Sequence, residues 1–111
     1  MSPREIKKKP PTEANFQRRV IQRLKSIKGL YYFKKEAKAI RGIPDIIICY
    51  KGQFFAWELK RSEKHQATAL QKHNIAKINK AGGYAAIVYP ENFAEELEKL
   101  LNYDSLNSSH Q

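Results

Sequence analysis

The sequence predicts an α/β fold in which a mixed four-stranded sheet is flanked by helices. Amphipathic segments alternate with β-branched or aromatic runs, which gives the element order α-β-β-β-α-β-α. Two neighbouring runs are joined by Lys51-Gly52, a pair that favours the tight turn of a hairpin. The chain has 111 residues, a length that suits one compact domain and leaves no room for a second core.

A helix is expected first, with Thr12 as its N-cap, an end near Ser26–Lys28, and Gly29 as the residue that stops it. At about 100° per residue its apolar side chains form one stripe. The members of this stripe are Phe16, Val20, Leu24 and Ile27. Residues 1–11, ahead of this helix, are rich in Lys and Pro and are expected to form a flexible basic arm.

The sheet and the other helices are expected to follow in order. A first strand is predicted from Leu30 to Phe33, or as far as Glu36, and a basic loop then leads to the turn Gly42-Ile43-Pro44. The later elements are predicted as strands over 45–50 and 53–59, a helix over 66–81, a strand over 84–89 and a helix after Pro90. Residues 12–102 would then form a single domain and residues 103–111 a polar tail.

The positive charge of the chain is concentrated in its first two-fifths. The net charge is +10, and residues 1–41 alone carry 13 Lys or Arg against three Glu, while residues 42–111 carry eight of each sign. Such a field attracts polyanions, of which nucleic acid is the commonest. A solvated basic surface that keeps the protein soluble is the alternative. A membrane is not expected as a partner, because the basic residues lack an apolar face suited to lipid.

Composition excludes several classes of protein. The single cysteine excludes an intramolecular disulfide framework and a multi-thiolate zinc site, and Cys49 is expected to pack as a small apolar residue in its strand. The longest apolar runs, 46–50 and 84–89, are too short to cross a bilayer. The basic N-terminus has no apolar segment behind it, so a secretory signal is not expected and the protein is expected to be intracellular and cytoplasmic.

Polar residues occur where the local pattern calls for apolar ones. Glu13 falls within about 60° of the apolar stripe of the first helix, and Gln71 shares a face with apolar positions of the second helix. Alternation along the third strand puts Glu58 and Lys60 on the face opposite its large apolar residues. Asp45 opens the partner strand of the same hairpin. These positions would gather charged groups against the protein rather than in solvent.

Three of these residues, Asp45, Glu58 and Glu13, would repel one another unless a cation lay between them. Oxygen ligands favour a hard ion, Mg²⁺ first and Mn²⁺ as a substitute. Lys60 would hold an ammonium beside the metal, where it could orient or help deprotonate a water and stabilise charge on a phosphate. These are the components of metal-assisted phosphodiester hydrolysis.

The motif Gly42-Ile43-Pro44-Asp45, followed after twelve residues by Glu58-Leu59-Lys60, resembles the signature of the PD-(D/E)XK nucleases. Three further features resemble the compact VRR-NUC branch, which occurs alone in phages and is related to Holliday-junction resolvases. They are Glu13 in the first helix, Gln71 early in the next helix, and Gly82-Gly83-Tyr84 before a strand. The resemblance covers residues 12–90. The two parts of the short motif, the turn 42–45 and the strand residues 58–60, often occur together by chance. Together with the three further features they make five in the expected order, which is a specific pattern.

The resemblance implies a restriction-endonuclease-like core and a role for each motif residue. Asp45 and Glu58 would be the main metal ligands, with the backbone carbonyl of Leu59 completing the site, and Lys60 would act on the water. Glu13 and Gln71 would be accessory members that bind a second metal, bridge through water or orient the other residues. Stand-alone members of the branch are often homodimers, and a two-fold dimer matches the two-fold symmetry of a four-way junction.

We therefore expect a Mg²⁺-dependent, structure-selective DNA endonuclease that acts on branched DNA such as four-way junctions, in a prokaryotic, phage or viral host cell. The residues expected to bind phosphates are Lys34, Lys35, Lys38, Arg41 and Arg61. An enzyme that cuts nicks or flaps and a sequence-specific restriction enzyme are alternatives within the nucleases. A non-catalytic basic nucleic-acid-binding module is the alternative outside them.

The same residues also have purely structural interpretations. These are a first-turn acid at Glu13, a capping box between Thr68 and Gln71, a surface ion pair of Glu58 and Lys60, and turn chemistry at Asp45. His65 is expected to be a surface histidine and Trp57 to lie in the core. In the run 31–33, alternation would bury one or two side chains, which favours core packing over base stacking.

Overall fold

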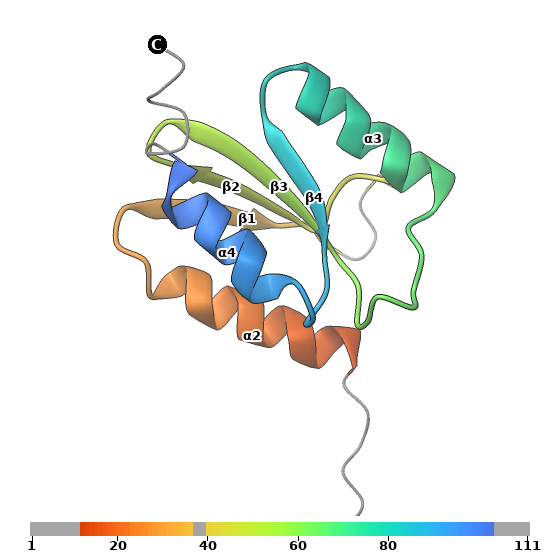
Figure 1. The fold of residues 1–111 in the computed structure, drawn as a ribbon, viewed down its shortest axis with the longest axis horizontal. Helices are drawn as coiled ribbons and strands as arrows, with labels where there is room; N and C mark the ends of the chain where they lie inside the picture. Colours follow the sequence, from red (N-terminus) through yellow and green to blue (C-terminus); the bar gives the residue numbers. More distant parts are fainter. Residues whose placement is uncertain (1–11, 37–39, 104–111) are drawn as a thin grey trace, which may run out of the picture.

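A computed structural model describes residues 12–36 and 40–103 of the chain. Its elements are α2 (Glu13–Lys25), β1 (Leu30–Lys34), β2 (Ile46–Tyr50), β3 (Gln53–Leu59), α3 (Ala69–Lys80), β4 (Tyr84–Val88) and α4 (Phe93–Leu101), shown in Figure 1. This order confirms the predicted α/β class. The predicted basic arm (1–11), Lys38 and residues 104–111 of the predicted tail lie outside the described residues.

The four strands form one mixed sheet in the order β1-β2-β3-β4. Strand β2 pairs antiparallel with both β1 and β3, while β3 and β4 run parallel and are connected through α3. The hairpin between β2 and β3 turns at Lys51 and Gly52, whose φ angles are 51° and 77°. Positive φ at both central residues is what a type I′ hairpin turn requires, so the predicted tight turn is confirmed.

The hydrophobic core lies between one face of the sheet and the helices α2 and α4. Its fully buried members include Phe16, Val20 and Leu24 of α2 and the inward strand residues Ile46, Ile48, Phe55, Trp57 and Leu59. Phe93 of α4 packs edge-on against Phe16 and Trp57, with ring centroids 5.8 and 6.1 Å apart. Trp57 is therefore a core residue, as predicted.

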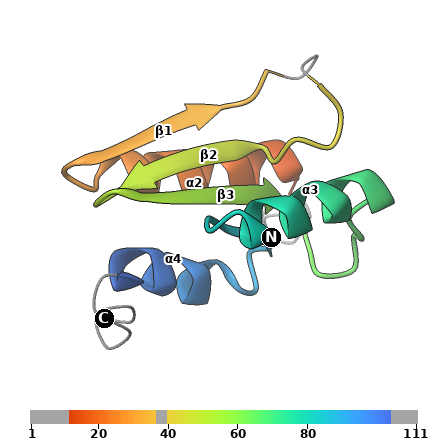
Figure 2. The ribbon, with the colours of Figure 1, turned by 90° about the horizontal axis from the view of Figure 1, so that it is seen from above.

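Helix α3 lies on the other face of the sheet, against β3 and β4. Seen from above in Figure 2, β1 and β2 lie in front of α2, and no helix of the described part of the chain lies over them. Their outward side chains stay accessible: Tyr31, Phe33 and Cys49 are exposed, and Tyr32 is half-buried. The prediction that Cys49 packs as an apolar residue was wrong, because α3 lies against β3 and β4 and does not cover β2, the strand that carries Cys49.

Helix α3 begins later in the chain than predicted, at Ala69, because the side chain of Thr68 caps it. At the C-terminal end, Tyr103 packs edge-on against Phe55, with ring centroids 5.2 Å apart. None of the helices in the described part of the chain is long and apolar enough to cross a membrane.

Candidate active site

Asp45 is positioned where the β2–β3 ladder ends. The last antiparallel pair of this ladder is Ile46 with Trp57. Beyond that pair the Asp45 side chain, in place of a backbone carbonyl, serves as the acceptor: its Oδ2 accepts a hydrogen bond from the Leu59 N–H at 2.7 Å. The Asp45 carbonyl accepts another from the Lys35 N–H at 2.8 Å. The strand therefore begins at Ile46 and not, as predicted, at Asp45. The Asp45 carboxylate is held by β3, and the Asp45 backbone is held by Lys35, directly after β1.

Glu58 is the buried partner of Asp45, with only 2% of its surface exposed. Its Oε2 accepts a hydrogen bond from Gln71 Nε2 at 3.0 Å and lies 3.6 Å from Lys60 Nζ. Its Oε1 is also buried, but it has no hydrogen-bond partner within the described part of the chain. A buried carboxylate oxygen without a partner is costly. A cation at this atom would satisfy it.

The pKa of Glu58 is raised to about 8. Burial of the carboxylate is the largest cause, and the negative charge of Asp45 raises the pKa further. The positive charges of Lys60 and Lys35 lower the pKa but do not offset these two effects. A hydrogen bond to Asp45 raises the pKa as well, so the metal-free chain keeps a proton on Glu58 instead of placing two charged carboxylates side by side.

Gln71 connects the start of α3 to Glu58. Its backbone N–H donates to Thr68 Oγ1 at 3.1 Å, and its Oε1 accepts from the Thr68 N–H at 2.9 Å, which completes a capping box. Because Oε1 is engaged in the cap, the amide presents its NH₂ group to the carboxylate of Glu58. The capping box is thus confirmed, and the same side chain also contacts Glu58, so the two interpretations of Gln71 do not exclude each other.

The turn that leads to Asp45 fits against α3 through a glycine. Gly42 has a φ of 82°, and a Cβ at this position would lie 2.5 Å from Leu70 Cγ and 2.8 Å from Asn74 Nδ2. Glycine alone permits both the backbone conformation and this close approach. The contact brings the first turn of α3, which carries Gln71, next to the turn that carries Asp45.

Glu13 lies at the edge of the site. It is the first residue of α2, and the cap of this helix is Thr12, whose Oγ1 accepts from the Asn15 N–H at 3.0 Å. Burial raises the pKa of Glu13, and the negative charge of Asp45 raises it further. Over residues 12–36 and 40–103, no three Asp, Glu, His or Cys side chains are arranged to hold one metal ion. Asp45 and Glu58 thus form the central pair, and Glu13 is an outlying carboxylate.

The residues predicted to bind phosphates fall into two groups. Lys35 is half-buried: its Nζ donates to the Ile43 carbonyl at 2.8 Å, and its charge acts on Glu58. It therefore belongs to the site itself. The exposed members of the set are Lys34, Arg41 and Arg61, and Lys38 lies outside the described residues.

The loop after β3 adds a histidine that the sequence analysis did not assign to the site. His65 Nε2 accepts a hydrogen bond from Arg61 Nε at 2.8 Å, and its Nδ1 lies 2.9 Å from Ser62 Oγ. The ring is half-buried, and both His65 and Arg61 lower the pKa of Glu13. His65 is thus more than a surface histidine. No spacing pattern signals it, and the only clue in the sequence is its place shortly after Lys60.

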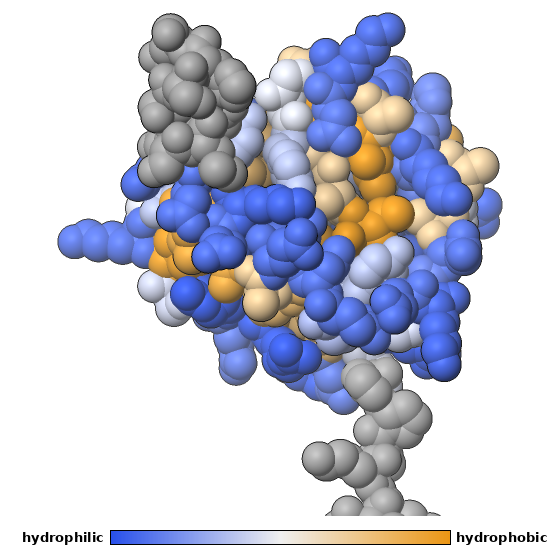
Figure 3. Space-filling model, in the orientation of Figure 1, coloured by the Kyte–Doolittle hydropathy of each residue, from blue (hydrophilic) through white to orange (hydrophobic). Residues whose placement is uncertain are grey.

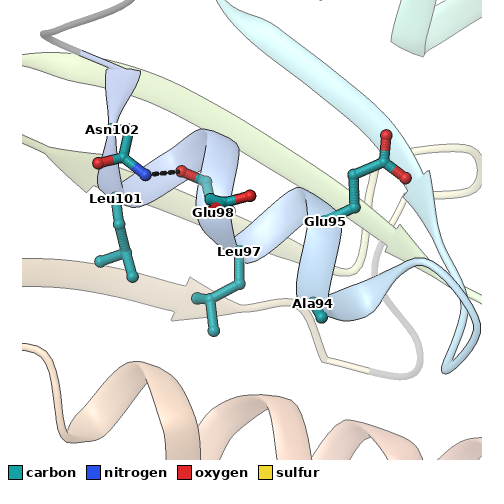
Figure 4. A pocket seen from close by; sticks show the side chains of 6 residues that line it. All are labelled: Ala94, Glu95, Leu97, Glu98, Leu101 and Asn102. Atoms are coloured by element: carbon teal, nitrogen blue, oxygen red, sulfur yellow. Dashed lines mark hydrogen bonds between the residues drawn. The ribbon is translucent and has the colours of Figure 1, made fainter.

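A pocket of about 450 Å³ on α4 is separate from this site (Figure 4). It is lined by Ala94, Glu95, Leu97, Glu98, Leu101 and Asn102. Two glutamates make it unsuited to a polyanion, and α4 lies on the face of the sheet opposite α3. Figure 3 shows this side of the molecule, where hydrophilic residues dominate and the apolar surface is broken into separate areas.

A four-stranded mixed sheet with Asp45, Glu58 and Lys60 at the edge of one hairpin defines a restriction-endonuclease-like fold. A solved structure described as a VRR_NUC domain protein superimposes on this chain with a TM-score of 0.68 at 21% sequence identity, covering 88% of this chain and 92% of that one. The likeness confirms the predicted VRR-NUC fold. No protein-family model matches the sequence, and no curated protein matches it significantly.

Proposed function

We propose that this protein is a Mg²⁺-dependent endonuclease that hydrolyses phosphodiester bonds in branched DNA. The observation that carries the proposal is the buried Glu58: no donor among residues 12–36 and 40–103 reaches its Oε1, and burial together with Asp45 raises its pKa. Such a cluster destabilises a fold unless a ligand satisfies it, and a divalent cation is the ligand that carboxylates favour. The likeness to a VRR_NUC domain supports membership of a nuclease-domain family.

The donor set suits a hard divalent cation. Asp45 and Glu58 would hold it together with the backbone carbonyl of Leu59, which gives oxygen ligands only. Mg²⁺ fits such a set first, and Mn²⁺ can replace it. When bound, the ion supplies charge stabilisation at the phosphate and a more acidic water.

Lys60 is placed to act on the attacking water. Its ammonium lies 3.6 Å from Glu58 Oε2, and 14% of its side chain is exposed, so it is held by the carboxylate yet within reach of solvent. It would donate a hydrogen bond to the water and then to the phosphate oxygen that gains charge. The water oxygen would bond to phosphorus as the bond from phosphorus to the leaving oxygen breaks, and the water would lose one proton to solvent while the leaving oxygen takes one up from solvent. Gln71 keeps Glu58 in position throughout.

Selectivity for branched DNA would come from shape. The sequence contains no helix-turn-helix or zinc-finger motif for reading bases in a duplex. The phosphates would be held by the exposed Arg41 and Arg61 and by Lys35 at the site, whereas Lys34 pairs with Ile46 and so belongs to the opposite face of the sheet. A homodimer would present two such sites to the two-fold symmetry of a four-way junction, in the cytoplasm of the host cell.

Cleavage of labelled four-way junction, flap and linear duplex DNA tests the proposal. Wild type and Asp45→Asn are compared with Mg²⁺, Mn²⁺ or EDTA, and Glu95→Gln, which changes an exposed carboxylate on α4, serves as the control variant. We expect paired, symmetric junction cuts that require the metal and Asp45, with DNA binding retained in Asp45→Asn. If the protein cuts only the flap or the linear duplex, in a metal-dependent way, the proposed nuclease activity would stand and the proposed selectivity for four-way junctions would be rejected.

Tight binding without cleavage under any of these conditions would favour a non-catalytic nucleic-acid-binding module. The excess of positive charge in residues 1–41 would suffice for that function. Asp45→Asn should then leave the protein's interaction with DNA unchanged or tighten it, because one repelling carboxylate is lost.

A further inference from the structure

Aromatic side chains lie on the uncovered half of the sheet. Tyr31 and Phe33 of β1 are 69% and 55% exposed, and Phe54 of β3 is 42% exposed. The strand register aligns Tyr31 with Cys49, and Cys49 with Phe54, so these side chains form a row across three strands. Phe33 lies next to Tyr31 on the same face, two residues along β1. We refer to these four residues as the aromatic row.

The aromatic row lies on the same face as the carboxylates. Asp45 precedes Cys49 by four residues, and Glu58 follows Phe54 by four, so within each pair the side chains have the same parity. Four residues of strand span about 13 Å. A nucleic-acid strand that crosses the row would therefore reach the carboxylates within a few nucleotides.

The border of the aromatic row is basic and partly hollow. Its lysines are Lys35 at the carboxylate end and Lys77 and Lys80 in the last turn of α3, the helix that lies on this face of the sheet. At Phe54 the row continues into a hollow of about 470 Å³ that Ile78 and Gly83 also line. Aromatic rings with lysines along their border suit a ligand that carries both flat apolar groups and negative charge.

Charge and area favour nucleic acid over a second copy of the chain. A second copy seated on this face through the same surface would bring its own Lys77 and Lys80 against these lysines. The exposed parts of Tyr31, Phe33 and Phe54 amount to roughly 250–400 Å², given about 150–250 Å² for a whole aromatic side chain. A stable interface buries about 800 Å² on each partner. Unpaired bases need less area, because each one stacks on a single ring.

We propose that the aromatic row binds unpaired bases of the DNA strand beside the cleavage site. The proposal rests on the nuclease function above and deepens it, because it names the substrate feature that the site selects. In an intact duplex the bases stack on one another and cannot reach the rings, whereas branches, flaps and gaps offer unpaired bases. Aromatic residues on the open face of a four-stranded sheet stack bases in this way in RNA-recognition domains.

Binding of two labelled single strands tests the row without cleavage. One strand consists of about 12 thymidines, and the other has the same phosphates with abasic sites in place of the bases. In EDTA at fixed salt, wild type should bind the thymidine strand about 5- to 100-fold more tightly, as expected for one or two stacked bases. The double variant Tyr31→Ser/Phe33→Ser should lose this difference and keep its affinity for the abasic strand, while Tyr31→Trp should retain both.

The control variant is Ile40→Ser, which changes an exposed apolar residue outside the aromatic row and should behave as wild type. Cys49 gives a readout that needs no substitution, because it is the single cysteine and is exposed within the row. The thymidine strand should slow its reaction with a thiol reagent several-fold. The abasic strand, at equal occupancy, should slow it much less.

Equal affinity of wild type for the two strands, or equal loss of both affinities in the double variant, would overturn the proposal. A wild-type dimer that dissociates in the double variant, measured by light scattering, would also overturn it and identify the row as a contact between copies. Failure of the proposed function is seen separately, as no cleavage by wild type with Mg²⁺, since the binding comparison requires no cleavage.

Discussion

Replacing Glu58 by glutamine should stabilise the metal-free protein, and more so as the pH rises. The pKa of Glu58 is raised to about 8 in the folded chain from an ordinary value of 4.5. Below pH 4.5 the carboxyl is protonated in both the folded and the unfolded chain, so a neutral amide of similar shape changes little. Between 4.5 and 8 the unfolded chain releases this proton and the folded chain keeps it, so the wild type loses stability as the pH rises. Glu58→Gln has no such proton to lose.

The magnitude follows from the two pKa values. The difference between 4.5 and about 8, at 1.36 kcal/mol per unit, sets an upper limit of about 5 kcal/mol at pH 8. Water penetration and side-chain movement relax a buried charge, so we expect about 2–3 kcal/mol. For a chain of this size such a gain raises Tm by roughly 10 °C or more.

Thermal unfolding followed by circular dichroism in EDTA, from pH 5 to pH 8, measures the effect. The difference between the curves of wild type and Glu58→Gln cancels the other titrating groups. Glu96→Gln is the matched control: Glu96 is also buried, but it accepts from the Tyr84 hydroxyl at 2.7 Å and pairs with Lys99 at 3.3 Å. We expect this control to lower Tm, because it weakens satisfied contacts.

Addition of Mg²⁺ at pH 8 should raise Tm of wild type and change that of Glu58→Gln much less, since the ligand stabilises only the chain that binds it. Parallel curves for the two proteins across the pH range would refute the reasoning. A Glu58→Gln variant that is less stable than wild type at pH 8 would also refute it. The charge of Glu58 would then be stabilised by its neighbours in the folded, metal-free protein.

Three further predictions concern the residues that build the site. Gly42→Ala should cost about 2–4 kcal/mol in denaturant unfolding, whereas Gly29→Ala, with the same φ of 82° but open space around it, should cost about 1 kcal/mol; equal costs would show that packing against α3 is unimportant. Thr68→Ala should cost about 1 kcal/mol in Tm measurements and lower the cleavage rate, because Gln71 loses the cap partner that orients its amide; an unchanged rate would separate the cap from the site. Lys60→Met should slow cleavage about 100-fold or more with DNA affinity changed less than about 3-fold; matched losses of rate and affinity would assign Lys60 to DNA binding.

The centre of the site could be predicted because one hairpin builds it. The turn at Lys51-Gly52 sets the register of β2 and β3, and this register brings the Asp45 side chain to the Leu59 N–H, directly beside Glu58. Strand alternation then decides which face the carboxylates share. These are local rules, so sequence reasoning needed no knowledge of how distant segments pack.

The parts that could not be predicted depend on contacts between distant segments. Lys35 reads as a phosphate contact in the sequence, but the chain after β1 folds back so that its ammonium meets the Ile43 carbonyl and acts on Glu58. The exposure of Tyr31 and Phe33 depends on where α3 sits. Alternation predicts which side chains of a strand share a face of the sheet. It does not predict that α3 covers this face only at β3 and β4 and leaves β1 and β2 open.

The uneven distribution of charge along the chain is explained by what the site would have to bind. In the proposed function, Asp45 and Glu58 would place negative charge where a phosphodiester has to come, and repulsion would keep a polyanion away from these carboxylates alone. The fold sets β1, from the segment that carries the whole positive excess, beside β2, and Lys35 brings one of those charges to Glu58. The same strand carries Tyr31 and Phe33 on the carboxylate face. If both proposals hold, strand β1 would combine attraction of phosphates with contact to bases, and substitutions in it should change substrate choice before they change the chemistry.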